Sequence, residues 1–316
     1  DTLAYPGSFQ TSMRDIWGSS ASDVYVVGHN DQNRGLMWHY DGVSWKDVKL
    51  STTQGGTIAG PIDLSAIYGF SANDIWAVGE KIFYNPNPPP NFLDSSLIIH
   101  YDGVKWEEIK APSGHELQSV CGRAPNDVWA GGINTLFHFD GRNWRSYPIE
   151  IPPEGMQFAW IAAVAINEVY VVGFKNDIVP PIDSTVYVLY RFDGNSWSTV
   201  DSVIETVNSP PPKFGFALFA VGNTLFSAGG GVYRRVGSVW VKMLDDPHVW
   251  RVRGDREDNL FAAGGRGTIY HYNGTDWQRI TPASGFSGDI LGIWTDGKEA
   301  FLVGHNGYIT YILHGR

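Results

Sequence analysis

The stretch "HYDGVSW" at residues 39–45 recurs along the chain, and this recurrence decides the fold. The other copies are "HYDGVKW" at 100–106, "HFDGRNW" at 138–144, "RFDGNSW" at 191–197 and "HYNGTDW" at 271–277. Asp followed by Gly favours a tight turn, because the Asp side chain bonds to its own backbone and Gly accepts a positive φ. Each copy therefore predicts a hairpin whose second strand begins with tryptophan.

A second repeated stretch precedes the first one in each unit. It reads "SASDVYVVG" at 20–28, "SANDIWAVG" at 71–79, "APNDVWAGG" at 124–132 and "AINEVYVVG" at 165–173, with weaker copies at 221–230, 256–265 and 297–305. A period of roughly fifty residues is typical of radial repeats. Each unit holds four short apolar or alternating runs divided by turn residues, which indicates four strands. Seven such units predict an all-β fold, a seven-bladed β-propeller of four-stranded antiparallel blades.

The two ends of the chain are expected to meet in one blade. The last unit stops after "GYITYILHGR" at 307–316, which matches a third strand, and no copy of the first stretch follows it. A strand within residues 1–12 is therefore predicted to complete the C-terminal blade at 288–316 and to close the ring. The seven units account for residues 1–316 as a single propeller domain.

Composition limits the classes of partner. The chain of 316 residues carries a net charge of −10, which disfavours binding to a phosphate backbone, so no nucleic-acid partner is expected. No apolar stretch is long enough to cross a bilayer. Cys121 is the single cysteine, which excludes an intrachain disulfide framework. We expect a monomer without a metal or other cofactor, whose partner is a carbohydrate or a protein ligand.

The two stretches together resemble the degenerate repeat "S-x-x-D-V-x-x-V-G … H-Y-D-G-x-x-W" of bacterial seven-bladed propellers, which are similar to Asp-box and Kelch-like propellers. The resemblance covers essentially the whole chain. An Asp-box usually reads Ser-x-Asp-x-Gly-x-Thr-Trp, whereas Gly directly follows Asp here, and this departure weakens a sialidase-type assignment. Because propellers include enzymes, receptors and passive platforms, the resemblance implies the fold and says little about function.

Residue types that recur at equivalent positions of most copies are interpreted as scaffold, and Arg191 fills the histidine position in the fourth copy. These are the turn residues Asp23, Asp74 and Asp127, the histidines His39, His100, His138 and His271, and the tryptophans Trp45, Trp106, Trp144, Trp197 and Trp277. The histidines outside the repeat are His29, His115, His248, His305 and His314. Irregular insertions fall in the loops between second and third strands and in the blade linkers. Since these lie on one face of a propeller, that face is the predicted site of function.

The residue after the second-strand Gly yields three catalytic candidates. It is His29 in the first unit, Glu80 in the second and His305 in the seventh, and these units adjoin once the ring closes. Such residues suit general acid–base chemistry or a loose metal site. The alternative is that polar residues at strand ends simply face water.

Cationic and aromatic departures from the repeat yield the ligand-binding candidates. They are Arg14, Trp160, Lys175, Trp250, Arg251 and Arg266. Arginine pairs with carboxylates of an anionic ligand, and an exposed indole forms a platform for a sugar ring. The alternatives are ion pairs within the protein, to Asp15, Glu116, Asp177 or Asp289, and packing of the indoles between blades.

These features predict an extracytoplasmic binding propeller, in an extracellular, periplasmic or cell-surface location, that holds a carbohydrate or protein ligand on its loop-rich face. The alternative is a glycan-active enzyme, a glycoside hydrolase or polysaccharide lyase, with its site at the mouth of the central channel. A hydrolase needs two carboxylates roughly 5–10 Å apart. A lyase needs a base beside an arginine, for which His29, His305 and Arg14 are the candidates. Neither "G-x-S-x-G" nor "H-E-x-x-H" occurs.

Overall fold

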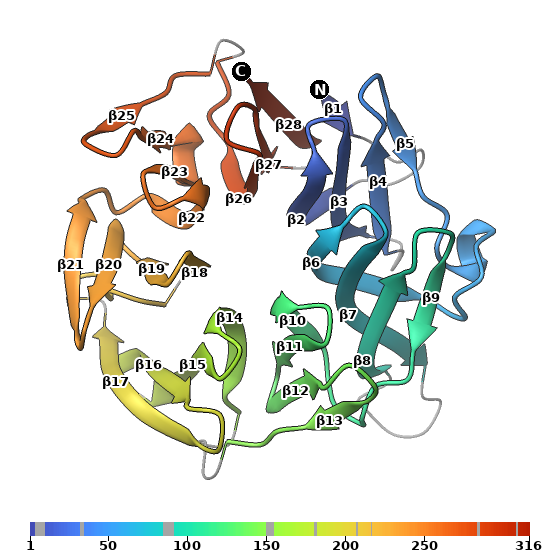
Figure 1. Ribbon diagram of the computed structural model, residues 1–316, viewed down its shortest axis with the longest axis horizontal. Coiled ribbons are helices and arrows are strands. Elements are labelled where there is room, and N and C mark those ends of the chain that lie inside the picture. The colour runs from blue at the N-terminus through green and yellow to red at the C-terminus, as the bar shows by residue number, and fades with distance from the viewer. Residues whose placement is uncertain are drawn as a thin grey trace.

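Short alternating runs and Asx–Gly turns divide the chain into strands that pair in order into seven antiparallel sheets, arranged as blades around a central channel (Figure 1). This computed structural model describes residues 1–3, 10–31, 35–84, 92–149, 155–179, 182–206, 208–215, 217–282, 285–307 and 309–316. The predicted seven-bladed propeller is confirmed.

The first four blades follow the chain from the inner to the outer strand. Blade 1 contains β2 (Thr11–Ser20), β3 (Asp23–Asn30), β4 (Leu36–Tyr40) and β5 (Trp45–Asp47). Blade 2 contains β6 (Ile62–Ser71), β7 (Asp74–Tyr84), β8 (Phe92–Tyr101) and β9 (Trp106–Ile109). Blade 3 contains β10 (Leu117–Ala124), β11 (Asp127–Gly132), β12 (Thr135–Phe139) and β13 (Trp144–Ser146). Blade 4 contains β14 (Gln157–Ala165), β15 (Glu168–Val179), β16 (Ile182–Phe192) and β17 (Trp197–Thr206).

The last three blades complete the ring. Blade 5 contains β18 (Ala217–Val221), β19 (Thr224–Ala228), β20 (Val232–Val236) and β21 (Val239–Leu244). Blade 6 contains β22 (Val249–Arg256), β23 (Asn259–Gly264), β24 (Ile269–Tyr272) and β25 (Trp277–Arg279). Blade 7 contains β26 (Asp289–Thr295), β27 (Ala300–Asn306), β28 (Ile309–Gly315) and the N-terminal β1 (Thr2–Leu3). Short 3₁₀ turns lie at Thr52–Gln54 and Gly265–Gly267.

The N-terminal strand closes the ring, as predicted, although it is shorter than expected. Thr2 of β1 lies opposite Tyr311 of β28. The N-terminal ammonium of Asp1 donates to the carbonyl of Ile312 at 2.9 Å, and the Ile312 amide donates back to Asp1 at 2.8 Å. Residues 11–12, which the prediction included in the closing strand, belong to β2 instead, and residues 4–9 lie outside the described part of the chain.

The repeated histidine ties the third strand of a blade to the repeated acid or amide on its second strand. In each case the histidine Nε2 lies within hydrogen-bonding distance of an Oδ1 atom. The distance is 2.6 Å from His39 to Asp23, 2.7 Å from His100 to Asp74, 2.8 Å from His138 to Asp127 and 2.6 Å from His271 to Asn259. The scaffold interpretation of these histidines is confirmed. The aspartates do more than form turns, because they bind the neighbouring strand. His314, which sequence analysis placed outside the repeat, makes the same contact with Glu299 at 2.6 Å and therefore belongs to the scaffold.

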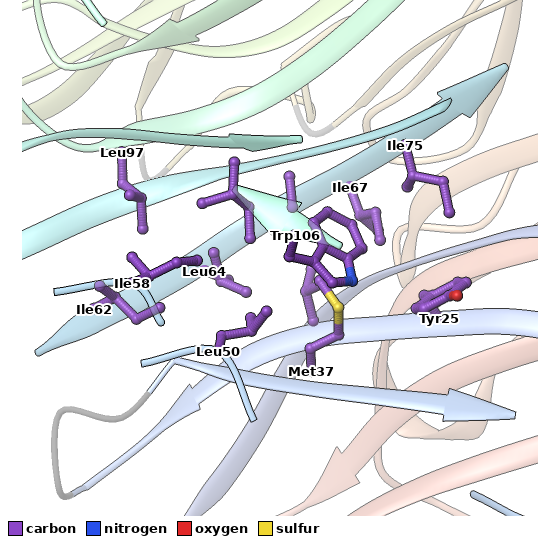
Figure 2. Close-up of a cluster of buried hydrophobic side chains, with 13 residues drawn as sticks. Tyr25, Met37, Leu50, Ile58, Ile62, Leu64, Ile67, Ile75, Leu97 and Trp106 are labelled. Atoms are coloured by element: carbon purple, nitrogen blue, oxygen red, sulfur yellow. The ribbon is translucent and has the colours of Figure 1, made fainter. Parts of the chain in front are cut away.

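The repeated tryptophan packs against a ring of the preceding blade, as predicted. Figure 2 shows Trp106 of β9 among apolar side chains shared by blades 1 and 2, and its ring lies 6.1 Å from that of Tyr25 in β3. The corresponding distance is 5.5 Å between Trp144 and Trp76. These side chains stay out of the channel and join one blade to the next.

The first prediction concerns the Asp–Gly turn. Gly42 has φ +88, and a Cβ on it would lie 2.8 Å from the Cβ of Ser22. Asp41 Oδ1 fixes this turn by accepting the amides of Val43 and Ser44 at 3.0 and 2.8 Å. We expect Gly42→Ala to lower the free energy of unfolding by about 1–2 kcal/mol for the left-handed backbone, with a further loss from the contact. Gly60→Ala is the control, because Gly60 has φ +86 with no atom within 4 Å of the added methyl group. Denaturant titration measures the free energy of unfolding of both variants. Equal losses would exclude a role for the contact between the added Cβ and Ser22.

Candidate functional site

The topology brings the starts of the inner strands and the ends of the second strands to one face of the ring. Thr11 at the start of β2 lies opposite Asn30 at the end of β3, and Asp63 near the start of β6 lies opposite Glu80. We call this the loop-rich face. Parts of its insertion loops, at residues 32–34, 85–91 and 180–181, lie outside the described residues.

Four acidic residues of blades 2 and 3 meet at this face. They are Asp63, Glu80, Asp94 and Glu116, and we call them the rim cluster. Because Asp63 and Glu80 are directly opposite across β6 and β7, their side chains project from the same side of the sheet. Asp94 Oδ2 accepts the backbone amide of Glu116 at 2.9 Å, and its Oδ1 lies 3.3 Å from His115 Nδ1.

Arg14 of blade 1 is the cation that reaches the rim cluster. Its Nη1 donates to Ser65 Oγ at 2.7 Å and to Glu116 Oε1 at 3.1 Å, and Ser65 Oγ donates to the same carboxylate oxygen at 3.0 Å. Gln118 Nε2 donates to the other oxygen of Glu116 at 3.3 Å. Arg14 therefore forms an ion pair within the protein, the alternative to ligand binding that the sequence left open. Glu116 is well compensated, whereas no ion pair is formed by Asp63 or Glu80 among the described residues.

Burial and mutual repulsion raise the pKa of two of these carboxyl groups. Burial raises the pKa of Glu80 to about 7, and the charges of Glu116, Asp63 and Asp94 add to the shift. Burial also raises the pKa of Asp63 to about 6, and Arg14 partly opposes this shift. Asp63 is only 7% exposed, and its Oδ1 has no hydrogen-bond partner within the described ranges. The rim cluster therefore gains negative charge as the pH rises through 6 to 7.

The three catalytic candidates do not form one hydrogen-bonded group. His29 of β3 lies opposite Ser12, and burial, with a contribution from Arg14, lowers its pKa to about 4. His305 of β27 lies opposite Asp289 of β26. The Nδ1 atoms of both histidines are buried without a partner among the described residues. The field of Arg14 reaches both His29 and Glu80, but no contact joins His305 to either of them in the part of the chain that is described.

Arg251 lines the central channel, in a cavity that Arg14 and Trp160 also line. Its Nε donates to the carbonyl of Leu291 in blade 7 at 2.8 Å, and burial lowers its pKa to about 10. The channel cavity of about 240 Å³ also contains Asp15, whose Oδ2 accepts the amide of Ile67 at 3.0 Å. Arg251 therefore connects neighbouring blades here.

The remaining ligand-binding candidates lie in blades 4 and 6, on other blades than the rim cluster. The rings of Trp160 and Phe174 stack 5.6 Å apart, and Lys175 follows on β15. Trp250 lies against Gly265, where an added Cβ would come within 2.9 Å of the indole. Arg266 is exposed, with a backbone amide 3.4 Å from Asp289 Oδ1. Trp160 lines the channel cavity together with Arg14 and Arg251, whereas Lys175, Trp250 and Arg266 are not part of its lining.

Sequence reasoning missed Asp63 and Asp94 and considered Glu116 only as a partner for arginine. A signal was present, because Ser12, Asp63 and Glu116 each precede the inner-strand residue that lies opposite the repeated second-strand glycine. Comparing this repeat position around the ring would have shown adjacent blades carrying acids there.

Within the described ranges, no group of three or more His, Cys, Asp or Glu side chains could hold a metal ion. No helix in the same ranges is long and apolar enough to span a bilayer.

Comparison with known proteins supports the fold. No protein-family model and no curated protein matches the chain. Among solved structures, YCF48 bound to D1 peptide is 13% identical, with a TM-score of 0.60 and coverage of 98% of this chain and 95% of that one. The WD40 β-propeller domain of Doa1 is 12% identical, with a TM-score of 0.63 and coverage of 100% and 96%. An extracellular domain assigned to a hybrid two component system of B. thetaiotaomicron is 14% identical, with a TM-score of 0.65 and coverage of 99% and 39%. At these identities the likeness concerns the fold alone, and the resemblance to Asp-box and Kelch-like propellers stays a prediction.

Proposed function

We propose that this chain is a ligand-binding propeller that holds a segment of a protein partner, through a basic side chain, at the rim cluster. The observation that carries the proposal is the surplus of carboxyl groups there. Four acids face one arginine, and that arginine is already bound to Glu116. A bound D1 peptide in the structurally similar YCF48 agrees with peptide binding by a propeller of this kind.

The chemistry of the rim cluster favours a cation. A lysine or arginine side chain would donate charge-assisted hydrogen bonds to Glu80 and to the unpartnered oxygen of Asp63. Its charge would also relieve the repulsion that raises the pKa of Glu80, so binding would release a proton bound near pH 7. Affinity should therefore increase as the pH rises from 5 to 8.

The second prediction tests this proposal with labelled peptides of lysine, arginine or glutamate embedded in glycine and serine. We expect the basic peptides to bind at pH 8 and the acidic peptide not to bind. Glu80→Gln should weaken binding about tenfold, which corresponds to about 1.4 kcal/mol for one charge-assisted contact. Glu107→Gln is the matched control, because Glu107 is 54% exposed on the outer strand of blade 2 and the charge change is the same. Fluorescence anisotropy that shows equal losses for both variants would reject the rim cluster as the site.

One observation favours a second candidate function, the glycan-active enzyme. Glu80, with its pKa near 7, would be a protonated general acid, and Glu116, held by Arg14 and Gln118, would be an ionised partner. A glycan array combined with a release assay on neutral and polyanionic polysaccharides separates the two candidates. Turnover that Glu80→Gln abolishes would favour the enzyme, and glycan binding without release would make the ligand a carbohydrate.

An extracytoplasmic location and a monomeric state are also part of the proposal. The location is supported by the fold shared with an extracellular domain. Cell fractionation with an antibody tests the location, and light scattering during gel filtration tests the state.

A further inference from the structure

The inner strands of the blades surround the central channel, and a cavity of about 240 Å³ lies within it (Figure 1). Among the described residues, its lining contains three arginines, Arg14, Arg251 and Arg253, but only one carboxylate, that of Asp15. Arg14 is bound to Glu116 at the rim. Arg251 and Arg253 therefore share one acid, and the cavity carries an excess of positive charge.

The position of Arg253 is uncharged in every other blade. Arg253 lies opposite Phe261, the aromatic ring on the second strand of blade 6. The residues opposite the equivalent rings of the other six blades are Trp17, Tyr68, Cys121, Ala162, Phe219 and Trp294. The repeat therefore does not require a guanidinium group at this point of the channel.

The position of Arg251 connects neighbouring blades without a positive charge elsewhere in the ring. Arg251, Asp15 and Ser119 each lie opposite the residue that precedes the second-strand glycine. Ser119 Oγ accepts the amide of Ile161 in the next blade at 3.2 Å, as Asp15 accepts the amide of Ile67 at 3.0 Å. A hydroxyl group is thus sufficient for this connection, and the two arginines bring more charge into the channel than its construction requires.

Arg253 retains hydrogen-bond donors for a ligand. Its Nη1 donates to the carbonyls of Leu218 and Val252 at 3.2 and 2.9 Å, and its guanidinium carbon lies 5.3 Å from the centre of the Phe219 ring. Within the described ranges, its Nε and Nη2 have no acceptor and no carboxylate forms an ion pair with it. Because a charge removed from bulk water is costly unless it is paired, this guanidinium group favours the entry of an anion.

The charge of Arg253 acts across the whole cavity. Burial raises the pKa of Tyr68 in blade 2 to about 12, and Arg253 partly opposes this shift. Burial lowers the pKa of Arg251 to about 10; the charge of Arg253 adds to this shift, whereas Asp15 opposes it. A further negative charge in the cavity would act on Arg251 as Asp15 does and would relieve the repulsion between the two arginines.

We propose that the channel cavity binds a small carboxylate, held by the guanidinium group of Arg253 and by the charge of Arg251. Guanidinium groups bind carboxylates through paired, charge-assisted hydrogen bonds. The rings of Trp17, Phe219 and Trp294 also line the cavity, and they favour a ligand with a carbon skeleton over an inorganic anion.

The size of the cavity limits the ligand. Its 240 Å³ equal the volume of about eight water molecules at about 30 Å³ each, so a ligand of about eight non-hydrogen atoms fits. The site takes the opposite charge to the rim cluster, and the proposal does not rest on the proposed function.

The test uses succinate, a carboxylate of about this size, and succinamide, its neutral counterpart, in a buffer without chloride. We expect isothermal titration calorimetry to show succinate binding with a dissociation constant of about 0.1–1 mM, a modest affinity for a small ligand. Succinamide should bind at least tenfold more weakly, because it lacks the charge that the arginines recognise.

Three variants locate the site. Arg253→Met keeps an unbranched side chain without the guanidinium group and should weaken succinate binding at least tenfold. Arg256→Met is the matched control, because Arg256 lies on the same strand with 61% of its side chain exposed and should leave binding unchanged. Asp15→Asn removes the competing carboxylate, keeps an oxygen for the amide of Ile67 and should strengthen binding at least threefold. Thermal melting verifies that each variant folds.

Succinate binding that is lost in Arg253→Met and strengthened in Asp15→Asn supports the proposal. Absence of binding, equal binding of succinate and succinamide, equal losses in the two arginine variants, or weaker binding in Asp15→Asn overturns it. Inorganic phosphate that binds through Arg253 where succinate does not would reject a carboxylate as the ligand. Glu80→Gln should not weaken succinate binding, so failure here is distinct from failure of the rim-cluster proposal.

Discussion

Replacing Trp129 with alanine is expected to lower the free energy of unfolding by about 3–5 kcal/mol, the range for large aromatic residues removed from a core. Trp129 is fully buried between blades 3 and 4. Its rings lie 4.2 Å from His138, 5.1 Å from Phe192 and 5.5 Å from Trp197, and its Nε1 donates to Asp127 at 3.2 Å. The substitution removes the ring that joins blades 3 and 4 and leaves a cavity. The closed ring of seven blades prevents the neighbouring blades from moving in to fill it.

The matched control for this prediction is Phe261→Ala. Phe261 holds the same position in blade 6, but it lacks the tryptophan of a following blade and is partly exposed. We therefore expect a loss of about half as much or less, because exposed apolar area contributes little when removed. Guanidinium titration of both variants, followed by circular dichroism, measures the difference. If Phe261→Ala lowered the free energy of unfolding as much as Trp129→Ala, the result would contradict the view that a blade junction depends on a ring packed between a histidine and a tryptophan.

The fold was predictable because most blades repeat the same turn residues and the same outer-strand tryptophan. Asp41 and Gly42 specify a turn, Trp45 specifies a buried outer strand, and the recurrence of both at regular intervals gives the number of blades. Even the closure followed from a missing copy of the repeat. The length of the closing strand was predicted wrongly, because the prediction ran one strand through residues 1–12 and did not use the Pro6–Gly7 pair of the sequence as a break between β1 and β2.

The candidate site was predictable only in part, because it depends on neighbours from three blades. Glu80 was identified from its place in the repeat, but the rise of its pKa comes first from burial and then from the charges of Glu116 in the next blade and Asp63 across a strand pair. The partner of Arg14 lies 102 residues away along the chain. His305 illustrates the converse, since an equivalent position on an adjoining blade did not bring it into contact with Glu80 within the described residues.

Glu80→Gln is expected to change how stability depends on pH. The pKa of Glu80 is raised from 4.5 to about 7 in the folded protein, so folding favours its protonated form. This stabilising contribution is fully present below pH 4.5 and is lost as the pH rises through 7. Glutamine cannot ionise, so the variant avoids that loss. Because Glu80 is half-exposed, we discount the full shift and expect the variant to gain about 1–2 kcal/mol relative to the parent between pH 4.5 and 8.

The difference between the two proteins isolates Glu80 from the other titrating groups. His29, whose lowered pKa makes stability fall as the pH drops from 6.5 towards 4, is present in both and cancels. Glu107→Gln makes the same chemical change on the exposed outer strand and is the matched control. Urea titrations at half-unit steps of pH measure all three proteins. A flat difference for Glu80→Gln would mean that burial and the neighbouring carboxylates do not raise the pKa of Glu80. The rim cluster would then lack the unsatisfied charge on which cation binding depends.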